Sequence, residues 1–201
     1  MKNLESTTVR TALLAELFGA VLLLGACGGG GSDAAAPAPA TSAASPPPAT
    51  PTSTGATCGI SDFAATALAR VNAVRAAGAD CHSRGVFPPA AALTWNAKLT
   101  AAASAHSADM AAKNYFSHTS ADGRSMSDRV NAAGYLWSGL GENIAAGYAG
   151  LDAVMDGWVT SDGHCANLMS ANLTEIGLAC VPGTSSSTYN TYWTMDLGKP
   201  H

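Results

Sequence analysis

The chain has 201 residues, a formal net charge of −4 at pH 7, and a composition that is 47% hydrophobic and only 12% charged. The absence of any basic run, together with this charge, argues against nucleic acid as a partner. The length allows one domain of ordinary size with a single sizeable core.

Residues 1–26 have the composition of a secretory signal peptide. Lys2 and Arg10 precede a short apolar run that ends Leu24-Gly25-Ala26-Cys27, and this run is too short to span a bilayer as a mature helix. The last four residues resemble the box of a bacterial lipoprotein, in which cleavage leaves Cys27 as a lipid-modified amino terminus. The alternative is a plain signal peptide with a chance cysteine. We therefore expect an exported protein, either anchored as a lipoprotein at the cell envelope (outer membrane or cell surface) or secreted.

Residues 27–57 consist almost entirely of Gly, Ala, Pro, Ser and Thr, with Asp33 as their one charge. Such a segment cannot bury a core, so we expect a disordered tether. The tether would hold a folded domain at residues 58–201 clear of the membrane, and the lipid anchor would be its only membrane contact.

Four cysteines remain in the domain: Cys58, Cys81, Cys165 and Cys180. An even number in an exported chain suggests two disulfides. Proximity in sequence favours Cys58 with Cys81 and Cys165 with Cys180, out of three possible pairings. Cys165 follows a histidine, which would suit a Cys-His nucleophile, but in an oxidising compartment a structural disulfide is the favoured interpretation.

Apolar residues at helical spacing predict two helices in the first part of the domain. The first runs to residue 77, could be capped by Ser61-Asp62, and ends at Gly78. The second is predicted over residues 96–113. His106 lies on its apolar face, so we interpret it as a hydrogen-bonded core histidine.

Two further helices are predicted before the last strands. One begins at Ser125, with Asp128 as a capping acid, and stops at Gly134. The next has an apolar stripe and is broken at residues 161–163, after which residues 164–169 are expected to form one further turn. The stripe consists of Leu151, Val154, Met155 and Trp158.

Three segments are predicted as strands: residues 142–146, 175–181 and 189–197. In the second, alternation places Ile176, Leu178 and Cys180 on one face. Helices come first along the chain and then mix with a few strands. This order predicts an α+β fold in which helices cover an antiparallel sheet.

Glu142 and Glu175 are the only glutamates after residue 16. In a chain with so little charge, we do not expect them merely to solvate a surface. Segments carrying His118 and His164 flank Glu142 in sequence. We therefore expect these four side chains to meet in one polar cleft.

Short motifs are spread in order over residues 61–199. They include Val71-Asn72-Ala73-Val74-Arg75, Leu93-Thr94-Trp95-Asn96, Phe116-Ser117-His118-Thr119, Gly141-Glu142-Asn143-Ile144-Ala145, Ser161-Asp162-Gly163-His164, Glu175-Ile176-Gly177 and Tyr192-Trp193-Thr194. In this order and spacing the chain resembles the CAP superfamily (cysteine-rich secretory proteins, antigen 5 and pathogenesis-related 1), also called the SCP domain, and in particular its bacterial extracellular branch. The resemblance implies a three-layer α-β-α sandwich with a small antiparallel sheet.

The resemblance also implies a cleft tetrad of two histidines and two glutamates. His118 and His164 match the histidines, and Glu142 matches the first glutamate. The position of the second glutamate holds Ser161 in this chain. Glu175 could supply that role from a neighbouring strand.

Two imidazoles with one or two carboxylates can hold a divalent metal such as zinc, here with His118 and His164 as ligands and Glu142 as a ligand or supporting carboxylate. They could equally polarise water as general base and acid, or simply order the cleft through hydrogen bonds. The interpretation we favour is an exported module that binds a small molecule, a lipid, or an envelope or host protein. The alternative is a metal-assisted hydrolase of peptidase type that uses the same cleft.

Overall fold

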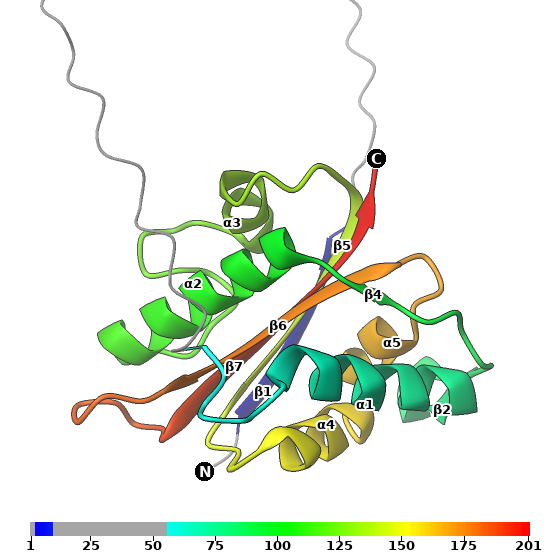
Figure 1. Cartoon of the computed structure of the whole chain (residues 1–201), viewed down its shortest axis with the longest axis horizontal. Coiled ribbons are helices and arrows are strands. Elements are labelled where there is room, and N and C mark those ends of the chain that lie inside the picture. The colour runs from blue at the N-terminus through cyan, green and yellow to red at the C-terminus, as the bar shows by residue number, and fades with distance from the viewer. Residues whose placement is uncertain (1–2, 10–55) are drawn as a thin grey trace, which may run out of the picture. The chain divides into compact units, whose positions relative to one another are not determined.

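The computed structural model describes residues 3–9 and 56–201 (Figure 1). The helices are α1 (Phe63–Ala77), α2 (Ala97–Lys113), α3 (Met126–Ala132), α4 (Leu151–Val159) and α5 (Asp162–Met169), with a 3₁₀ helix at His82–Arg84. The strands are β1 (Asn3–Val9), β2 (Ala79–Asp80), β3 (Val86–Phe87), β4 (Thr94–Trp95), β5 (Trp137–Ala146), β6 (Glu175–Pro182) and β7 (Thr191–Pro200).

The main sheet has the strand order β1-β5-β7-β6-β4. Its pairs are antiparallel except β4 with β6, which is parallel. The register places Glu142 of β5 opposite Asp196 of β7, and Asp196 opposite Gly177 of β6. β2 and β3 form a separate two-stranded ribbon. Glu142 and Asp196 therefore lie side by side on two adjacent long strands of the sheet, β5 and β7.

Helices cover both faces of the sheet (Figure 1). α2 and α3 lie on one face, and α1, α4 and α5 lie on the other. The α+β class and the three layers predicted from the sequence are confirmed. The strand at β5 is longer than predicted, and the short strands β2, β3 and β4 were not predicted, because two residues carry too little alternation to be recognised.

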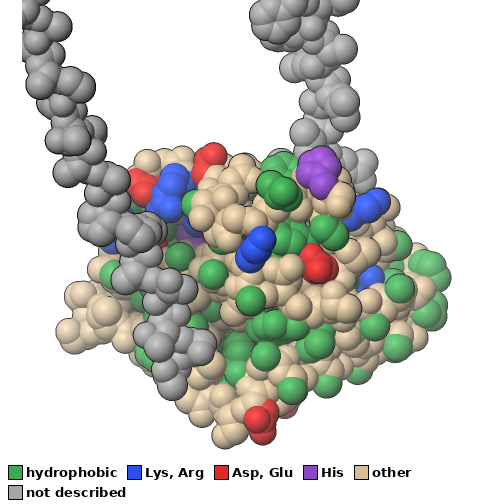
Figure 2. All heavy atoms as spheres, turned by 45° about the horizontal axis from the view of Figure 1, so that its top comes forward, with side chains coloured by type: hydrophobic (Ala, Val, Ile, Leu, Met, Phe, Trp, Pro, Cys, Tyr) green, Lys and Arg blue, Asp and Glu red, His purple; other side chains and the backbone are tan. Residues whose placement is uncertain are grey.

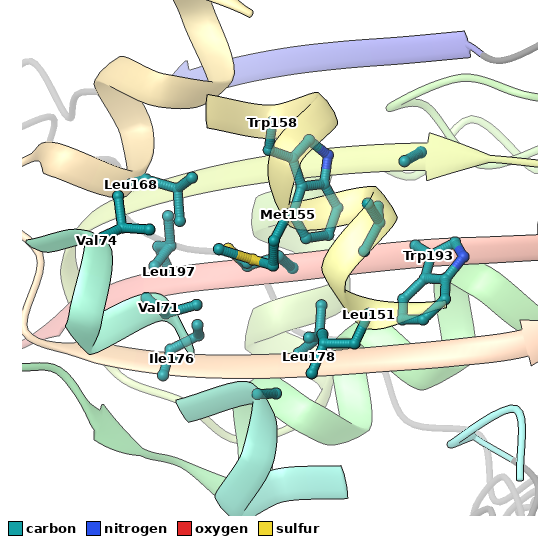
Figure 3. Packing of buried hydrophobic residues seen from close by; sticks show 14 of the residues in the cluster. Val71, Val74, Leu151, Met155, Trp158, Leu168, Ile176, Leu178, Trp193 and Leu197 are labelled. Atoms are coloured by element: carbon teal, nitrogen blue, oxygen red, sulfur yellow. The ribbon is translucent and has the colours of Figure 1, made fainter. Parts of the chain in front are cut away.

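The larger core fills the space between the sheet and the layer of α1, α4 and α5 (Figure 3). Alternate residues of β6 and β7 supply the sheet side, as the sequence predicted for β6. The side chains seen in Figure 3 include Val71, Val74, Leu151, Met155, Trp158, Leu168, Ile176, Leu178, Trp193 and Leu197. Leu178 and Trp158 are fully buried, so these layers are fixed by close packing.

The opposite face of the sheet packs against α2 and α3. Its apolar contacts come from two clusters: Leu99, Ala102, Met126, Val130, Tyr135 and Leu140, and Met110, Ala111, Ile144, Ala146 and Tyr192. A Cβ at Gly177 would collide with the backbone of Thr100, so α2 approaches β6 closely only because residue 177 is glycine. Ser107 and Thr194 share a buried hydrogen bond of 2.8 Å between α2 and β7.

The predicted helix boundaries are largely confirmed, and the capping chemistry explains two of them. Asn96 caps α2 by accepting from the backbone N–H groups of Lys98 and Leu99. Ser125 and Asp128 form the predicted capping box at the start of α3. The predicted side-chain cap of α1 is wrong: Asp62 has a left-handed backbone conformation, and its carboxylate makes no capping hydrogen bond.

Both disulfides are present, but the predicted pairing is wrong. Cys58 is bonded to Cys180, and Cys81 is bonded to Cys165. The segment before α1 runs beside β6, with Thr57 bridged to Cys180, and this brings Cys58 to the sheet. Proximity in sequence therefore failed because the fold, and not the local chain, places the thiols together.

β1 lies within the segment predicted as a signal peptide, residues 1–26. It pairs antiparallel with β5 from Asn3 opposite Ala146 to Val9 opposite Leu140. Cys27 and the predicted tether up to residue 55 lie outside the described residues. Within the described ranges, no helix is both long and apolar enough to cross a membrane.

Candidate functional site

His118 and Glu142 meet on the face of the sheet covered by α2 and α3. Glu142 is completely buried in the middle of β5, and the side chain of His118 is 16% exposed. Nδ1 of His118 lies 2.7 Å from Oε1 of Glu142, within hydrogen-bond distance. The structure thus brings together the first histidine and first glutamate of the predicted tetrad.

Arg129 of α3 completes this pair and is the main anchor of the site. Its guanidinium donates to Oε2 of Glu142 over 2.6 Å, and both side chains are almost fully buried. The same guanidinium donates to the carbonyl oxygen of His118 at 2.9 Å and to Oγ of Ser120 at 3.1 Å. Arg129 therefore fixes the Glu142 carboxylate and the loop that carries His118 at once.

The buried charges act on one another. Burial alone would raise the pKa of Glu142, but the hydrogen bond with His118 and the positive charge of Arg129 outweigh it and lower that pKa to about 2. Burial also lowers the pKa of His106 on α2 to about 4, although the nearby Glu142 charge acts in the opposite direction. His106 is fully buried, with Nε2 2.9 Å from the carbonyl oxygen of Ser117, in agreement with its interpretation as a core histidine.

Asp196 lies opposite Glu142 on the neighbouring strand and is also fully buried. Burial, followed by the repulsion from Glu142, raises the pKa of its carboxyl well above the usual value. Neither carboxyl oxygen has a hydrogen-bond partner among the described residues. The site therefore contains one ionised carboxylate, held by Arg129, beside one carboxyl group that burial favours in its neutral form.

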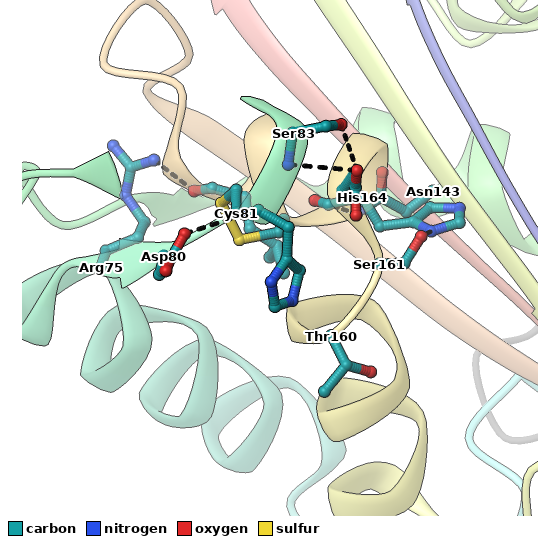
Figure 4. Close-up of a disulfide and its surroundings, with 12 residues drawn as sticks. Arg75, Asp80, Cys81, Ser83, Asn143, Thr160, Ser161 and His164 are labelled. Carbon is teal, nitrogen blue, oxygen red and sulfur yellow. Dashed lines mark hydrogen bonds between the residues drawn. A yellow bond between two sulfur atoms is a disulfide. The ribbon is translucent and has the colours of Figure 1, made fainter. Parts of the chain in front are cut away.

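His164 lies with α5 on the opposite face of the sheet (Figure 4). Its Nδ1 lies 2.7 Å from Oγ of Ser161, and its carbonyl oxygen accepts from Nδ2 of Asn143 at 3.1 Å. Asn143 follows Glu142 on β5, so the two side chains point to opposite faces of the sheet. Ser161 holds the place that the resemblance gave to a second glutamate, and here it is a hydrogen-bond partner of the second histidine.

Glu175 lies apart from His118 and Glu142. It begins β6, two strands across and two residues along from Glu142, which separates the two Cα atoms by roughly 12 Å at ordinary strand spacing. Its Oε2 accepts from the hydroxyl of Tyr135 at 2.6 Å and from Nδ2 of Asn96 at 3.2 Å. The structure places this carboxylate in a different environment from the predicted cleft.

The described residues do not fit a divalent metal. Both oxygens of Glu142 already hold His118 and Arg129, and the guanidinium would repel a cation. The buried Nε2 of His118 has no hydrogen-bond partner among the described residues and would offer a single ligand atom. Within the described part of the chain, no group of three or more His, Cys, Asp and Glu side chains is arranged to hold a metal ion.

The burial of three charged residues was not predicted from the sequence. Arg129 shares a face of α3 with Met126 and Val130, and an arginine on an apolar stripe is a signal of burial that could have been recognised. Arg75, which was named from the sequence only as part of a motif, is buried and donates to the carbonyl oxygens of Ala91, Leu168 and Ser170. Asp196 gave no signal, because alternation in β7 suggests that its face is solvated.

Comparison with known proteins identifies relatives of the chain. Residues 68–197 match the family described as CAP, the cysteine-rich secretory protein family. In Bacillus subtilis (strain 168), the uncharacterized protein YkwD is 32% identical over 68% of this chain and 49% of its own length. The uncharacterized membrane protein YlbC of the same strain is 36% identical over 44% of this chain and 25% of its own length. The chain thus spans about half, or less, of the length of these curated relatives.

A solved structure is similar in fold as well. The crystal structure of an extracellular protein containing an SCP domain from Bacillus anthracis str. Ames matches with a TM-score of 0.53 and 26% identity, over 68% of this chain and 41% of that chain. The family match begins within α1, covers β5, and ends at Leu197 within β7, so it includes the buried carboxyl pair. The chain belongs to the CAP family of cysteine-rich secretory proteins.

Proposed function

We propose that this chain is an exported CAP module, anchored at the cell envelope through Cys27, that binds a small and largely apolar ligand. The observation that carries the binding proposal is a groove of about 580 Å³ between the start of α1 and the start of α2. This volume lies within the range of small-molecule sites, roughly 300 to 1,000 Å³.

The lining of the groove sets the chemistry of the ligand. It is formed mainly by Phe63, Trp95, Leu178 and several alanines, with Asp62, Thr100 and Ser104 as polar groups. The groove follows the edge of β6 between the two segments that pair with it, at Trp95 and at Thr57. Apolar walls with a few hydroxyl groups favour a lipid-like molecule, with an apolar body and one polar group.

Export is supported by the two disulfides, which form and persist in oxidising compartments. The printed description of the Bacillus anthracis relative as an extracellular protein agrees with it. In this proposal the His118–Glu142–Arg129 network has a structural role, since its carboxylate is sealed from solvent. The groove, and not the predicted His/Glu cleft, then contacts the ligand.

A fluorescent fatty acid, 11-(dansylamino)undecanoic acid, tests the groove. We expect saturable binding to wild type and at least about tenfold weaker binding to Ala101→Phe, because the ring would fill space on the α2 wall of the groove. The matched control is Ala112→Phe on the same helix, at an exposed position outside the groove. Equal binding by all three proteins, or no saturable binding by wild type, would refute the proposal. Peptide hydrolysis by wild type that is lost in His118→Ala would instead support the hydrolase.

A further inference from the structure

Glu175, the fourth residue of the predicted tetrad, faces a second cavity of about 480 Å³. The cavity lies where the start of α2, the turn after α3, the start of β6 and the end of β7 converge. It is lined by Asn96, Ala97, Lys98, Tyr135, Leu136, Glu175, Pro200 and His201. It shares only Ala97 with the lining of the apolar groove, and its other residues are different, so the inference below goes beyond the proposed function.

The two oxygens of Glu175 have different tasks. Oε2 accepts both structural hydrogen bonds, from Tyr135 and Asn96, which hold the carboxylate in place. Oε1 accepts no hydrogen bond from any residue in the described ranges, so its lone pairs are available to a ligand. Burial and the bond to Glu175 raise the pKa of Tyr135, so the tyrosine remains a donor to the carboxylate.

The cavity around the carboxylate combines one lysine and one histidine with apolar surface. Lys98 lines the same cavity and forms no ion pair with Glu175 within the described chain. Leu136 is 75% exposed, which is unusual for a large hydrophobic side chain in this domain. Figure 2 shows a histidine, a basic and an acidic side chain near hydrophobic ones in the upper right part of the visible face.

These charges select the class of ligand. A purely cationic molecule would meet Lys98, and a purely anionic molecule would meet Glu175. A zwitterion satisfies both, with its ammonium donating to Oε1 of Glu175 and its carboxylate near Lys98. An apolar side chain on that ligand would cover Leu136. We propose that this cavity binds a small zwitterion of the α-amino-acid type with an apolar side chain.

The variant Glu175→Gln separates ligand binding from folding. Its amide oxygen can still accept from Tyr135 and Asn96, because both structural bonds go to one oxygen. Its amide N–H₂ would then face the ligand ammonium, so a donor replaces an acceptor and the negative charge is lost. The matched control is Asp152→Asn, which removes an exposed carboxylate on α4 outside the cavity.

The test follows the methyl signals of Leu136, which lines this cavity and not the apolar groove, by NMR during titration with three probes of similar shape: L-leucine, 3-methylbutylamine and 4-methylpentanoate. We expect saturable shifts with leucine, and clearly weaker binding of the amine and the acid. We expect at least about tenfold weaker leucine binding by Glu175→Gln, since bonds to charged groups contribute strongly. Asp152→Asn should bind as wild type.

Three outcomes would overturn the inference: no saturable leucine binding, equal binding of leucine and 3-methylbutylamine, or unchanged leucine binding by Glu175→Gln. Thermal melting of each variant accompanies the titration. If Glu175→Gln melts well below wild type, Lys98→Gln replaces it, because Lys98 has an exposed side chain at the rim of the cavity. Retention of full leucine affinity by Lys98→Gln would also overturn the inference.

Discussion

The buried pair of Glu142 and Arg129 allows a quantitative prediction. The substitution Glu142→Gln keeps the size of the side chain and its capacity for two hydrogen bonds, but removes the negative charge. The Arg129 guanidinium, whose side chain is 2% exposed, would then be a buried cation without a counter-charge. Breaking a buried ion pair by removing one partner typically costs about 3–5 kcal/mol.

The lowered pKa of Glu142 reflects the same interaction with Arg129 and gives a magnitude of the same order. It falls from 4.5 to about 2, and at about 1.4 kcal/mol per pKa unit the folded state favours the ionised form by roughly 3 kcal/mol. Because this pKa is lowered on folding, the stabilisation is present above pH 4.5 and is lost as the pH falls towards 2. Both routes therefore predict that Glu142→Gln loses about 3 kcal/mol at pH 7.

Urea unfolding at pH 7 with the disulfides intact measures this loss, since the midpoint shifts at a constant slope. The control is Asp156→Asn, which breaks the ion pair between Arg70 of α1 and the exposed carboxylate of Asp156 on α4 and should cost less than about 1 kcal/mol. Between pH 4.5 and 2, wild type should lose its advantage over Glu142→Gln. A loss at pH 7 no larger than that of the control would refute the reasoning that Glu142 compensates a buried charge.

Four further predictions concern the same framework. As the pH falls from 6.5 to 4, wild type should lose stability to urea, because His106 has a pKa lowered to about 4 in the folded protein and takes up its proton more readily when unfolded. His106→Gln should lose less stability over this pH range. An equal dependence of stability on pH in the two proteins would contradict this prediction. Asp196→Asn should stabilise the protein by about 1 kcal/mol. The gain should be larger at pH 8 than at pH 5, because the wild-type carboxyl ionises more easily in the unfolded state than in the folded one. If the variant is less stable than wild type at pH 8, the Asp196 carboxyl stabilises the fold and the prediction is wrong. The double variant Cys81→Ser, Cys165→Ser should lose about 2–4 kcal/mol of its free energy of unfolding. Peptide mapping of this variant without reduction should still recover the disulfide between Cys58 and Cys180. Recovery of Cys58 linked to Cys81 from wild type would refute the pairing. Zn²⁺ should leave the melting temperature of wild type unchanged, whereas a rise that His118→Ala lacks would demonstrate a metal site.

Most of the fold could be predicted because its signals are local. Helical spacing and caps such as Asn96 and Ser125 determine where helices begin, and strand alternation determines which residues of β6 face the larger core. The disulfides were mispaired because the adjacency of Cys58 and Cys180 depends on a strand contact across most of the domain. Local pattern contains no information about such a contact.

The candidate site was predicted only in part, because local sequence does not show which distant segments come together. Glu142 and His118 are joined as expected, but the resemblance treated four residues as one cluster. Alternation along β5 already separates Glu142 from its neighbour Asn143, which contacts α5 and His164 on the opposite face. Glu175 is drawn away by Tyr135, whose hydroxyl comes from the turn after α3. The positions of Asn143 and Glu175 relative to Glu142 become apparent only when the strand register is known.

The bond between Cys58 and Cys180 also determines how the domain would carry mechanical load. A pull on the chain ahead of Ala56 would reach Cys58 and pass through the disulfide into β6 near its carboxyl end, beside the bridge at Thr57. From there the force would spread into β7, which pairs with β6 along its whole length. The chain between the two cysteines lies outside this load path, so α1 to α5 and the cavity beside Glu175 would be shielded from tension, whereas the apolar groove includes Ala56 and Thr57 of the loaded segment. A module pulled from its amino-terminal side could thus keep the cavity beside Glu175 intact while tension acts directly on one wall of the apolar groove.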